Sequence, residues 1–251
     1  MRLDLAAVGD VMLDVIVPDV GPGARRHAPI RVRAGGSAVN AARAAAARGA
    51  RAAVIGRVGR DPAGALIADE LRRAAIEPAL AVDPAAATGT VAYVGDAIVA
   101  DRGANANLSP DDVPRALDAR AVLVSGYVLF HADTAAAGEA ALDRAKGLTC
   151  VDLASPSLAR AVDADVLVGN EETIAALGGL DALAREGTIV CETRGGRGAV
   201  AARGSERASA APTVVLARSP VGAGDVFAAR FVLALVGGAS LGDALSAATR
   251  G

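Results

Sequence analysis

Residues 221–231 read VGAGDVFAARF, and an apolar helical pattern begins inside this stretch, directly after three small residues. Gly222, Ala223 and Gly224 let a ligand approach the backbone closely, and the start of a helix leaves its first N–H groups free. Helix N-termini bind anions through these N–H groups and through the helix dipole. The stretch therefore predicts a helix whose first turn faces an anionic ligand.

Asp225 lies in the first turn of that predicted helix. A carboxylate is favoured there as a helix cap, which is a purely structural interpretation. Beside an anion site, a carboxylate is also placed to accept the proton of a hydroxyl group that attacks phosphorus, as phosphoryl transfer requires. From the local sequence alone, both interpretations stay open.

Outward from this stretch, short apolar runs alternate with alanine-rich helical patterns. The predicted strands are Leu5–Val8, Ala53–Ile55, Val122–Val124, Thr149–Leu153, Val166–Val168, Thr188–Cys191 and Ala199–Ala202. The predicted helices are Ala38–Arg48, Pro62–Ala75, Ala132–Lys146, Glu171–Leu177 and Asp225–Val236. This alternation predicts a doubly wound α/β fold, with a mostly parallel central sheet and helices on both faces.

Two regions interrupt the alternation, Asp10–Arg33 and Thr88–Arg102, and both are β-like rather than helical. We predict that segments at about 12–34 and 88–102 form a small β lid over a cleft, within one domain that spans residues 1–251. Ordinary edge strands of the main sheet are the alternative interpretation of these segments.

The composition is that of a soluble globular protein: 53% of the 251 residues are hydrophobic, 22% are charged, and the net charge is −2. Alanine accounts for 63 residues and aromatic residues for only five. Few aromatics argue against stacking on single-stranded nucleic acid, and a pI near 5.7 argues against a basic nucleic-acid surface. We therefore expect no nucleic-acid partner.

The first ten residues lack a signal-peptide pattern, and no run is long and apolar enough to predict a membrane span. Cys150 and Cys191 share no metal-ligand spacing, which predicts two free thiols in a reducing compartment and a cytoplasmic location. Lys146 is the single lysine, and the Walker phosphate loop is absent. A phosphate group would have to be bound by backbone N–H groups, arginines or Mg²⁺.

Two further glycine-containing segments predict ligand contacts. In residues 34–50, Gly35 and Gly36 allow close backbone approach, Ser37 can cap the following helix, and the amide of Asn40 can reach a ligand. In GDVMLD, residues 9–14, a strand ends where parallel sheets usually contact ligands, so Asp10 or Asp14 could bind hydroxyl groups. An ordinary turn and a solvated loop carboxylate are the alternatives.

Two later segments predict contacts to a nucleotide. Residues 170–172, Asn-Glu-Glu, follow a strand, and carboxylates there can hold Mg²⁺ through water, although Asn170 equally suits a helix cap. Residues 193–199, TRGGRGA, follow the next strand and can wrap phosphates with their backbone. A glycine-rich β-turn is the alternative for this second segment.

Taken together, these motifs resemble those of the ribokinase-like (PfkB) family of sugar and nucleoside kinases. Four segments occur in the family's order: GGSAVNAA at 35–42, RGANANLSPDDV at 102–113, the NEE segment at 170, and PVGAGDVFAA at 220–229. The resemblance extends from residue 3 to about residue 250. It implies a doubly wound fold with a β lid, and phosphorylation of a hydroxymethyl group with ATP and Mg²⁺.

The resemblance also implies a role for each matching residue. Asp225 would be the catalytic base, and Gly222, Ala223 and Gly224 would form the anion hole for the transferring phosphoryl group. The implied substrate-binding residues are Asp14, Gly35, Gly36, Asn40 and Asn105. The implied nucleotide-binding residues are Asn170, Thr193, Gly195 and Gly198, with Glu172 at the metal.

The sequence departs from the family pattern at several positions. Ser219, Pro220 and Val221 replace a segment that often carries an aspartate, which argues against a monovalent activating cation. Thr173 stands where the family places a glutamate, so Glu172, one position earlier, is the candidate substitute. Arg230 stands where the family usually has glycine, and the chain ends before the tail that commonly helps to enclose adenine.

The expected activity is ATP-dependent phosphorylation of a hydroxyl group on a sugar or sugar-like small molecule. A nucleoside kinase and a catalytically weak sensor that binds a sugar or nucleoside are the alternatives. A nucleotide-dependent oxidoreductase is disfavoured because the dinucleotide-binding fingerprint is absent. Apolar faces in residues 90–99 permit a homodimer through the lid.

Overall fold

The computed structural model contains a nine-stranded sheet and a four-stranded sheet, and it describes residues 2–19, 21, 25, 27–185, 187–213 and 221–250. The strands of the large sheet are β1 (Leu3–Val8), β4 (Ala52–Gly59), β5 (Glu77–Asp83), β8 (Ala119–Ser125), β9 (Leu148–Asp152), β10 (Val166–Asn170), β11 (Ile189–Thr193), β12 (Ala199–Arg203) and β13 (Glu206–Ala210). Their order is β13-β12-β11-β10-β9-β8-β1-β4-β5. Pairing is parallel from β5 to β11 and antiparallel from β11 to β13, which confirms the mostly parallel sheet.

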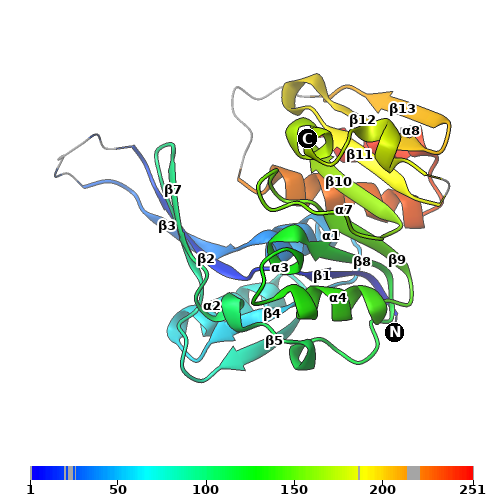
Figure 1. Ribbon diagram of the computed structural model, residues 1–251. Helices are drawn as coiled ribbons and strands as arrows, with labels where there is room; N and C mark the ends of the chain where they lie inside the picture. Colours follow the sequence, from blue (N-terminus) through cyan, green and yellow to red (C-terminus); the bar gives the residue numbers. More distant parts are fainter. Residues whose placement is uncertain are drawn as a thin grey trace.

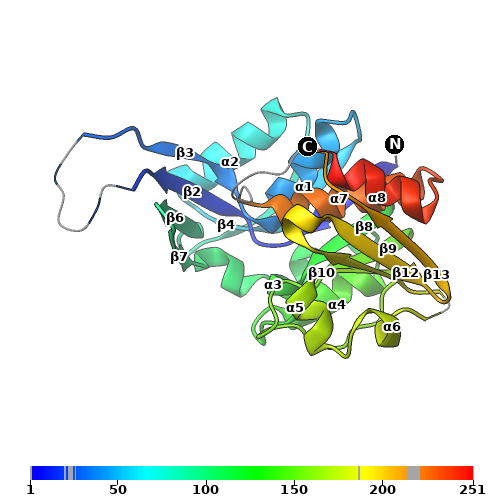
Figure 2. The same ribbon diagram turned by 90° about the horizontal axis from the view of Figure 1, so that it is seen from above.

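Helices cover both faces of this sheet (Figure 2). They are α1 (Ser37–Ala46), α2 (Pro62–Arg73), α3 (Gly126–Leu129), α4 (Ala135–Asp143), α5 (Glu171–Ala176), α6 (Leu180–Leu183), α7 (Ala223–Val236) and α8 (Leu241–Thr249). Helices α1, α2, α7 and α8 pack on one face around Phe231 and Leu245, and α3 to α6 pack on the other around Ile174. Alanines dominate the buried face of α1, and such small side chains let α1 and α7 pack closely.

The four-stranded sheet projects from the large one (Figure 1). Its strands are β2 (Met12–Val17), β3 (Arg31–Gly35), β6 (Thr90–Val94) and β7 (Ala97–Asp101), in the order β3-β2-β6-β7. The predicted β segments therefore lie outside the main sheet rather than at its edges. Residues 20, 22–24 and 26 of the first segment lie outside the described residues. That this sheet acts as a lid stays a prediction.

Several elements differ from expectation, and helices α3, α6 and α8 were not predicted. The helix predicted from Ala132 begins at Ala135, because the buried hydroxyl of Thr134 donates to the Val128 carbonyl at 2.7 Å and holds a turn there. The edge strands β5 and β13 were not predicted. Apart from the buried Asp83, both carry half-buried or exposed side chains, and β13 (ERASA) also lacks the apolar run typical of a central strand.

The carboxyl ends of the parallel strands form one edge of the sheet. The chain leaves β1 toward β4 on one side and reaches β8 on the other, so the strand order reverses between β1 and β8. Ligands of open α/β sheets bind at such a point. Ser125 and Asp152 are paired in register at the ends of β8 and β9 beside it. Within the described ranges, no helix is both long and apolar enough to cross a membrane.

Candidate active site

Helix α7 begins at Ala223, two residues before the predicted start at Asp225, and its first turn meets α1. Gly222 precedes α7 with φ of 78°, a left-handed conformation that favours glycine. A Cβ at Gly222 would lie only 2.5 Å from the Asn40 Nδ2. The Asn40 Nδ2 donates a hydrogen bond to the Asp225 Oδ2 at 2.9 Å. Two motifs that are far apart in the sequence therefore converge on one carboxylate.

Asp225 shares a small cavity with Asp152, Ser125 and Ser37, on the face of the sheet that α1 and α7 cover. Burial raises the pKa of Asp225, the nearby Asp152 raises it further, and the Asn40 hydrogen bond opposes both effects. Burial also raises the pKa of Asp152. A carboxylate whose charged form is disfavoured in this way holds a proton more readily than one in water.

Asp152 was missed by the sequence analysis. It is the last residue of β9, its Oδ1 accepts a hydrogen bond from the Ala154 N–H at 3.1 Å, and its Oδ2 lies 3.9 Å from where a Cβ on Gly224 would be. The available signal was a carboxylate at the end of an apolar strand. That signal becomes specific only when the neighbouring strand ends are known.

Asp14 lies on β2, and its side chain is fully buried. The Arg33 Nη2 lies 3.4 Å from the Asp14 Oδ2, but neither carboxylate oxygen has a hydrogen-bond partner among the described residues. Burial raises the pKa of Asp14, and Arg33 opposes this effect. A buried carboxylate without hydrogen bonds is costly unless a ligand supplies donors. Asp14 is thus suited to bind hydroxyl groups.

The paired glycines lie against this carboxylate and at the start of α1. A Cβ on Gly35 would lie 2.1 Å from the Asp14 Oδ1, so any side chain there would displace the carboxylate. Gly36, rather than Ser37, is the N-cap residue of α1, and the cap has no side-chain hydrogen bond. The Ser37 hydroxyl is buried without a partner among the described residues and lines the cavity of Asp225. The predicted capping role of Ser37 is therefore wrong.

Tyr93 of β6 and Tyr127 of α3 bring aromatic rings to the site. Burial, and then the charge of Asp14, raise the pKa of Tyr93 to about 12. Burial and the charges of Asp152 and Asp225 also raise the pKa of Tyr127. Both phenols therefore stay protonated at neutral pH and can donate hydrogen bonds.

Asn105 has its amide fully occupied by the protein. Its Oδ1 accepts from the Val11 N–H at 2.8 Å, and its Nδ2 donates to the Val11 and Arg102 carbonyls at 2.9 and 3.0 Å. This geometry assigns Asn105 to holding the β1–β2 connection. Its contact with substrate stays a prediction. These hydrogen bonds argue against it, because both polar atoms of the amide already have partners in the protein.

The residues predicted to bind nucleotide lie at the ends of β10 and β11, where Asn170 and Thr193 are paired in register. The Asn170 Oδ1 accepts from the Thr173 N–H at 2.8 Å, so Asn170 caps α5, the structural alternative noted above. The Thr193 hydroxyl donates to the Gly169 carbonyl at 3.3 Å. Gly195 and Gly198 lie in the turn that follows, which the Arg194 N–H closes onto the Gly198 carbonyl at 2.7 Å.

The departures from the family pattern have different surroundings. Thr173 is fully buried, and its hydroxyl has no partner among the described residues, whereas Glu172 is exposed. Arg230 donates from α7 to the Arg250 carbonyl, which ties the two C-terminal helices together. Ser219 and Pro220 lie outside the described residues.

The site fits Mg²⁺ bound together with a nucleotide rather than by protein alone. Among the described residues, no group of three or more acidic, histidine or cysteine side chains is arranged to hold a metal. Mg²⁺ commonly uses one or two carboxylates, with waters and substrate phosphates as its other ligands. Asp152 and Asp225 offer two carboxylates beside the first turn of α7. The exposed Glu172 lies on α5.

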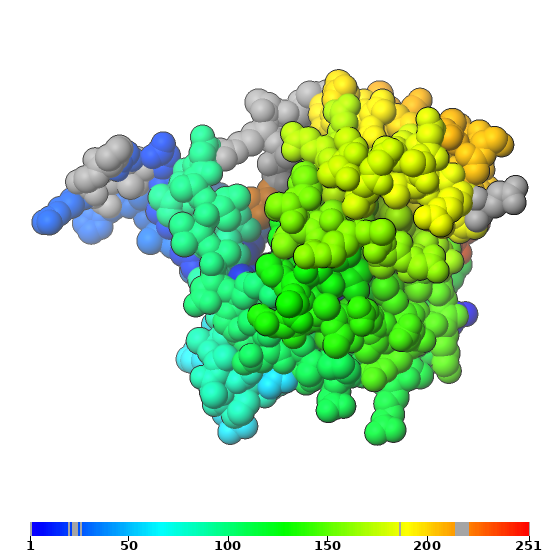
Figure 3. All heavy atoms as spheres, viewed as in Figure 1, coloured from blue at the N-terminus to red at the C-terminus, as the bar shows by residue number. Residues whose placement is uncertain are grey.

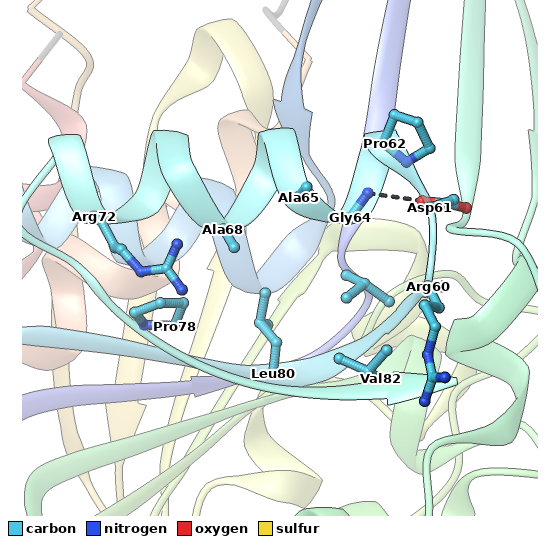
Figure 4. Close-up of a pocket in the computed structure, with 12 residues that line it drawn as sticks. Arg60, Asp61, Pro62, Gly64, Ala65, Ala68, Arg72, Pro78, Leu80 and Val82 are labelled. Carbon is cyan, nitrogen blue, oxygen red and sulfur yellow. Dashed lines mark hydrogen bonds between the residues drawn. The ribbon is translucent and has the colours of Figure 1, made fainter. Parts of the chain in front are cut away.

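The site opens into a hollow between the four-stranded sheet and the body of the molecule, and atoms coloured as the start of α7 lie in its depth (Figure 3). A separate cavity of about 540 Å³ lies between α2 and β5, with a floor of Pro78, Leu80 and Val82 (Figure 4). None of the predicted site residues lines that cavity.

Comparison with known proteins agrees with this geometry. The model of the pfkB family carbohydrate kinases matches residues 2–250. The bifunctional protein HldE of Caulobacter vibrioides (strain ATCC 19089 / CIP 103742 / CB 15) is 32% identical over 272 residues, which cover 94% of this chain and 56% of HldE. The chain therefore spans little more than half the length of that curated relative.

Several solved structures share the fold. Adenosine kinase from Sinorhizobium meliloti has a TM-score of 0.83 and 22% identity, and the match covers 99% of this chain and 92% of that one. A putative ribokinase II from E. coli, in complex with ATP and Mg²⁺, has a TM-score of 0.84 and 18% identity, with coverage of 98% and 90%. Because the family match covers nearly the whole chain, this protein belongs to the pfkB family of carbohydrate kinases.

Proposed function

We propose that this protein transfers the γ-phosphoryl group of ATP to a hydroxyl group of a sugar or sugar-like molecule, with Asp225 as the base. The observation that carries the proposal is the hydrogen bond of 2.9 Å from Asn40 to Asp225. It holds the carboxylate at the start of α7, beside N–H groups that can bind a transferring phosphoryl group. A helix cap alone would not require a donor from another helix.

Different groups of the chain bind the acceptor, accept its proton and stabilise the transferring phosphoryl group. Asp14 accepts hydrogen bonds from sugar hydroxyl groups, and the backbone of Gly35 and Gly36 lies close to the same ligand. Asp225 accepts the proton of the attacking hydroxyl at a carboxylate oxygen as the new P–O bond forms and the bond between the γ-phosphorus and the ADP oxygen breaks, which releases ADP. The N–H groups of residues 222–224 stabilise the charge that develops on the phosphoryl oxygens. When bound, Mg²⁺ would neutralise charge on the phosphates, and Asp152 would help to hold it.

The base is tested by replacing Asp225 with asparagine. We expect kcat in an ADP-coupled assay to fall by about 10³-fold or more, because a positioned acid or base contributes roughly 10²–10⁴ and the binding groups remain. Asp243→Asn is the matched control, because Asp243 lies in the first turn of α8 and accepts the Ser240 hydroxyl at 2.6 Å. The control should keep its activity within about twofold. Near-normal turnover in Asp225→Asn would overturn the assignment.

A catalytically weak sugar or nucleoside sensor is the second candidate. Two observations favour it. Thr173, which stands where the family has a glutamate, is buried, and the candidate substitute Glu172 is exposed. Sugars, sugar acids and nucleosides should be screened both for ATP consumption and for thermal stabilisation. Stabilisation by a ligand that is never phosphorylated would support the sensor, and ADP formation with one of them would exclude it.

Assembly and location are proposed on separate grounds. In β7, Ile98 and Val99 are each 66% exposed, which suits a homodimer through the small sheet. The Ile98→Lys substitution should convert such a dimer into a monomer, and sedimentation velocity measures that change.

We place the protein in the cytoplasm, where ATP is available and where the buried free thiols of Cys150 and Cys191 stay reduced. Cell fractionation tests this location.

A further inference from the structure

The buried end of β3 is held by two side chains instead of a neighbouring strand. Strand β3 is an edge of the four-stranded sheet and pairs only with β2. At Ala34, the backbone N–H donates to the Glu70 Oε2 at 3.1 Å, and the backbone carbonyl accepts from the Arg43 Nη1 at 2.5 Å. The N–H and the carbonyl group of Ala34 are thereby both hydrogen-bonded, as buried backbone requires.

The two side chains also bind each other. The Arg43 Nη2 lies 2.6 Å from the Glu70 Oε2, and the side chains are only 30% and 25% exposed. Arg43 comes from α1 and Glu70 from α2, so the pair links two helices to one strand. Hydrogen bonds between charged groups are shorter and stronger than neutral ones. We call Arg43 and Glu70 the edge clamp.

The position of the edge clamp connects it to the acceptor side of the site. Ala34 is fully buried and immediately precedes Gly35. The Asp14 carboxylate occupies the space that a side chain at Gly35 would need. A shift of Ala34 by a fraction of an ångström would move Gly35 and Gly36 relative to Asp14. The clamp has no hydrogen bond to the ends of β10 and β11, where the nucleotide residues lie.

The N-terminal end of α2 holds the start of a second strand of the four-stranded sheet, β6. The Asp61 Oδ2 accepts from the Thr88 N–H at 2.7 Å, and its Oδ1 accepts from the Thr88 hydroxyl at 2.6 Å. Asp61 also caps α2 through the Gly64 N–H at 2.8 Å (Figure 4). Thr88 lies two residues before β6. Helix α2 is therefore a rigid support for the small sheet.

We propose that Arg43 and Glu70 are positioning residues for the acceptor, which set the distance between the Gly35–Gly36 backbone and the Asp14 carboxylate through the Ala34 peptide. This inference rests on the proposed function, because Asp14 and the two glycines are its acceptor-binding groups. Loss of the clamp weakens acceptor binding and leaves nucleotide binding unchanged.

The kinetic test compares two adjacent carboxylates on α2. Asp69 pairs with Arg72 at 2.9 Å on the exposed face of the helix and has no hydrogen bond to β3 among the described residues. With the best acceptor from the panel, Glu70→Ala should raise the acceptor KM about tenfold, while kcat and the ATP KM change less than about twofold. Asp69→Ala should change none of them by more than about twofold. Glu70→Gln keeps an oxygen for the Ala34 N–H and should recover part of the acceptor affinity.

A second measurement does not depend on activity. Hydrogen exchange of the ligand-free protein should be at least about tenfold faster at the amides of residues 34–36 in Glu70→Ala, with no change in β10. An equal rise in both KM values, or unchanged exchange at residues 34–36, would overturn the clamp. If the wild type phosphorylates no acceptor, the proposed function fails, and the exchange data still decide whether the clamp holds β3.

Discussion

In the proposed site, the acceptor side (Asp14 and Asp225) and the nucleotide side (Asn170 and Thr193) satisfy their polar groups differently. On the acceptor side, Asp14 is fully buried without a hydrogen bond among the described residues, and Asp225 is held by a single side-chain donor. On the nucleotide side, Asn170 caps α5 and the Thr193 hydroxyl already donates to a backbone carbonyl. The first pair is poised to accept donors from a ligand, whereas the second pair has its partners in the protein.

This difference indicates where specificity resides. Buried carboxylates that lack donors bind a polyhydroxylated molecule in a fixed geometry, and they disfavour a ligand that leaves them unpaired. A nucleotide side built from turns can bind phosphates through backbone N–H groups, without side-chain contacts. Changes to acceptor-side carboxylates should therefore have large effects, and changes to nucleotide-side carboxylates should have small ones.

The largest effect on affinity is expected at Asp14. Asp14→Asn should raise the acceptor KM by about 100-fold, because charge-assisted hydrogen bonds to the sugar are lost, each of which is worth roughly 1.5–3 kcal/mol. The KM for ATP should change less than about twofold, since Asp14 lies on the opposite side of the site. Steady-state kinetics with each substrate varied in turn checks both values. A larger effect on ATP than on the acceptor would reverse the comparison.

Asp152 lies between the two sides, and its loss should have an intermediate effect. Asp152→Asn should lower kcat by roughly 30-fold and raise the Mg²⁺ concentration needed for half-maximal activity, because one of the two carboxylates beside α7 is removed. A titration of activity against Mg²⁺ at saturating ATP measures both quantities. Unchanged Mg²⁺ dependence would remove Asp152 from the metal site.

The burial of Asp225 predicts a pH-dependent change in stability. Its raised folded-state pKa means that the stability it contributes is present below pH 4 and is lost as pH rises through that pKa. Asparagine mimics the protonated form and can still accept from Asn40. Asp225→Asn should therefore melt about 2–4 °C above the wild type at pH 8, if roughly 1 kcal/mol is recovered.

That stabilisation should vanish on acidification. Melting curves of the metal-free protein at pH 8, 6 and 4 should show the difference between Asp225→Asn and wild type closing toward pH 4, where the wild-type carboxyl is protonated. Asp243→Asn, at the exposed cap of α8, should show no such gain at pH 8. A variant that is less stable than the wild type at pH 8 would contradict the assigned direction of the Asp225 pKa.

The smallest effect is expected on the nucleotide side, at Glu172. Glu172→Gln should change kcat and the Mg²⁺ requirement by less than about twofold, because exposed charges of this kind contribute little. The same Mg²⁺ titration used for Asp152 provides the comparison. A loss of tenfold or more would restore Glu172 as the substitute for the family's metal-site glutamate and would make the two sides of the site alike.

Much of the fold followed from local patterns, but the site required three-dimensional information. Buried strands such as Val166–Val168 and the helix after Gly222 were predicted because apolar runs and glycines act over a few residues. The Asn40–Asp225 contact joins residues 185 positions apart, and no spacing rule predicts it. Ser37 was assigned by residue type and Asn105 by the family resemblance, whereas their surroundings depend on which backbone groups the fold leaves unpaired.

The central claim is that a phosphoryl group passes from ATP to a hydroxyl group held beside Asp225, and ³¹P NMR of the reaction tests it most directly. Wild-type protein incubated with ATP, Mg²⁺ and each sugar of the panel should give ADP and one new phosphomonoester resonance in equal amounts with at least one sugar. The Asp225→Asn protein should give neither product over the same time. ADP with inorganic phosphate alone, or a phosphomonoester formed equally well by the variant, would contradict the account.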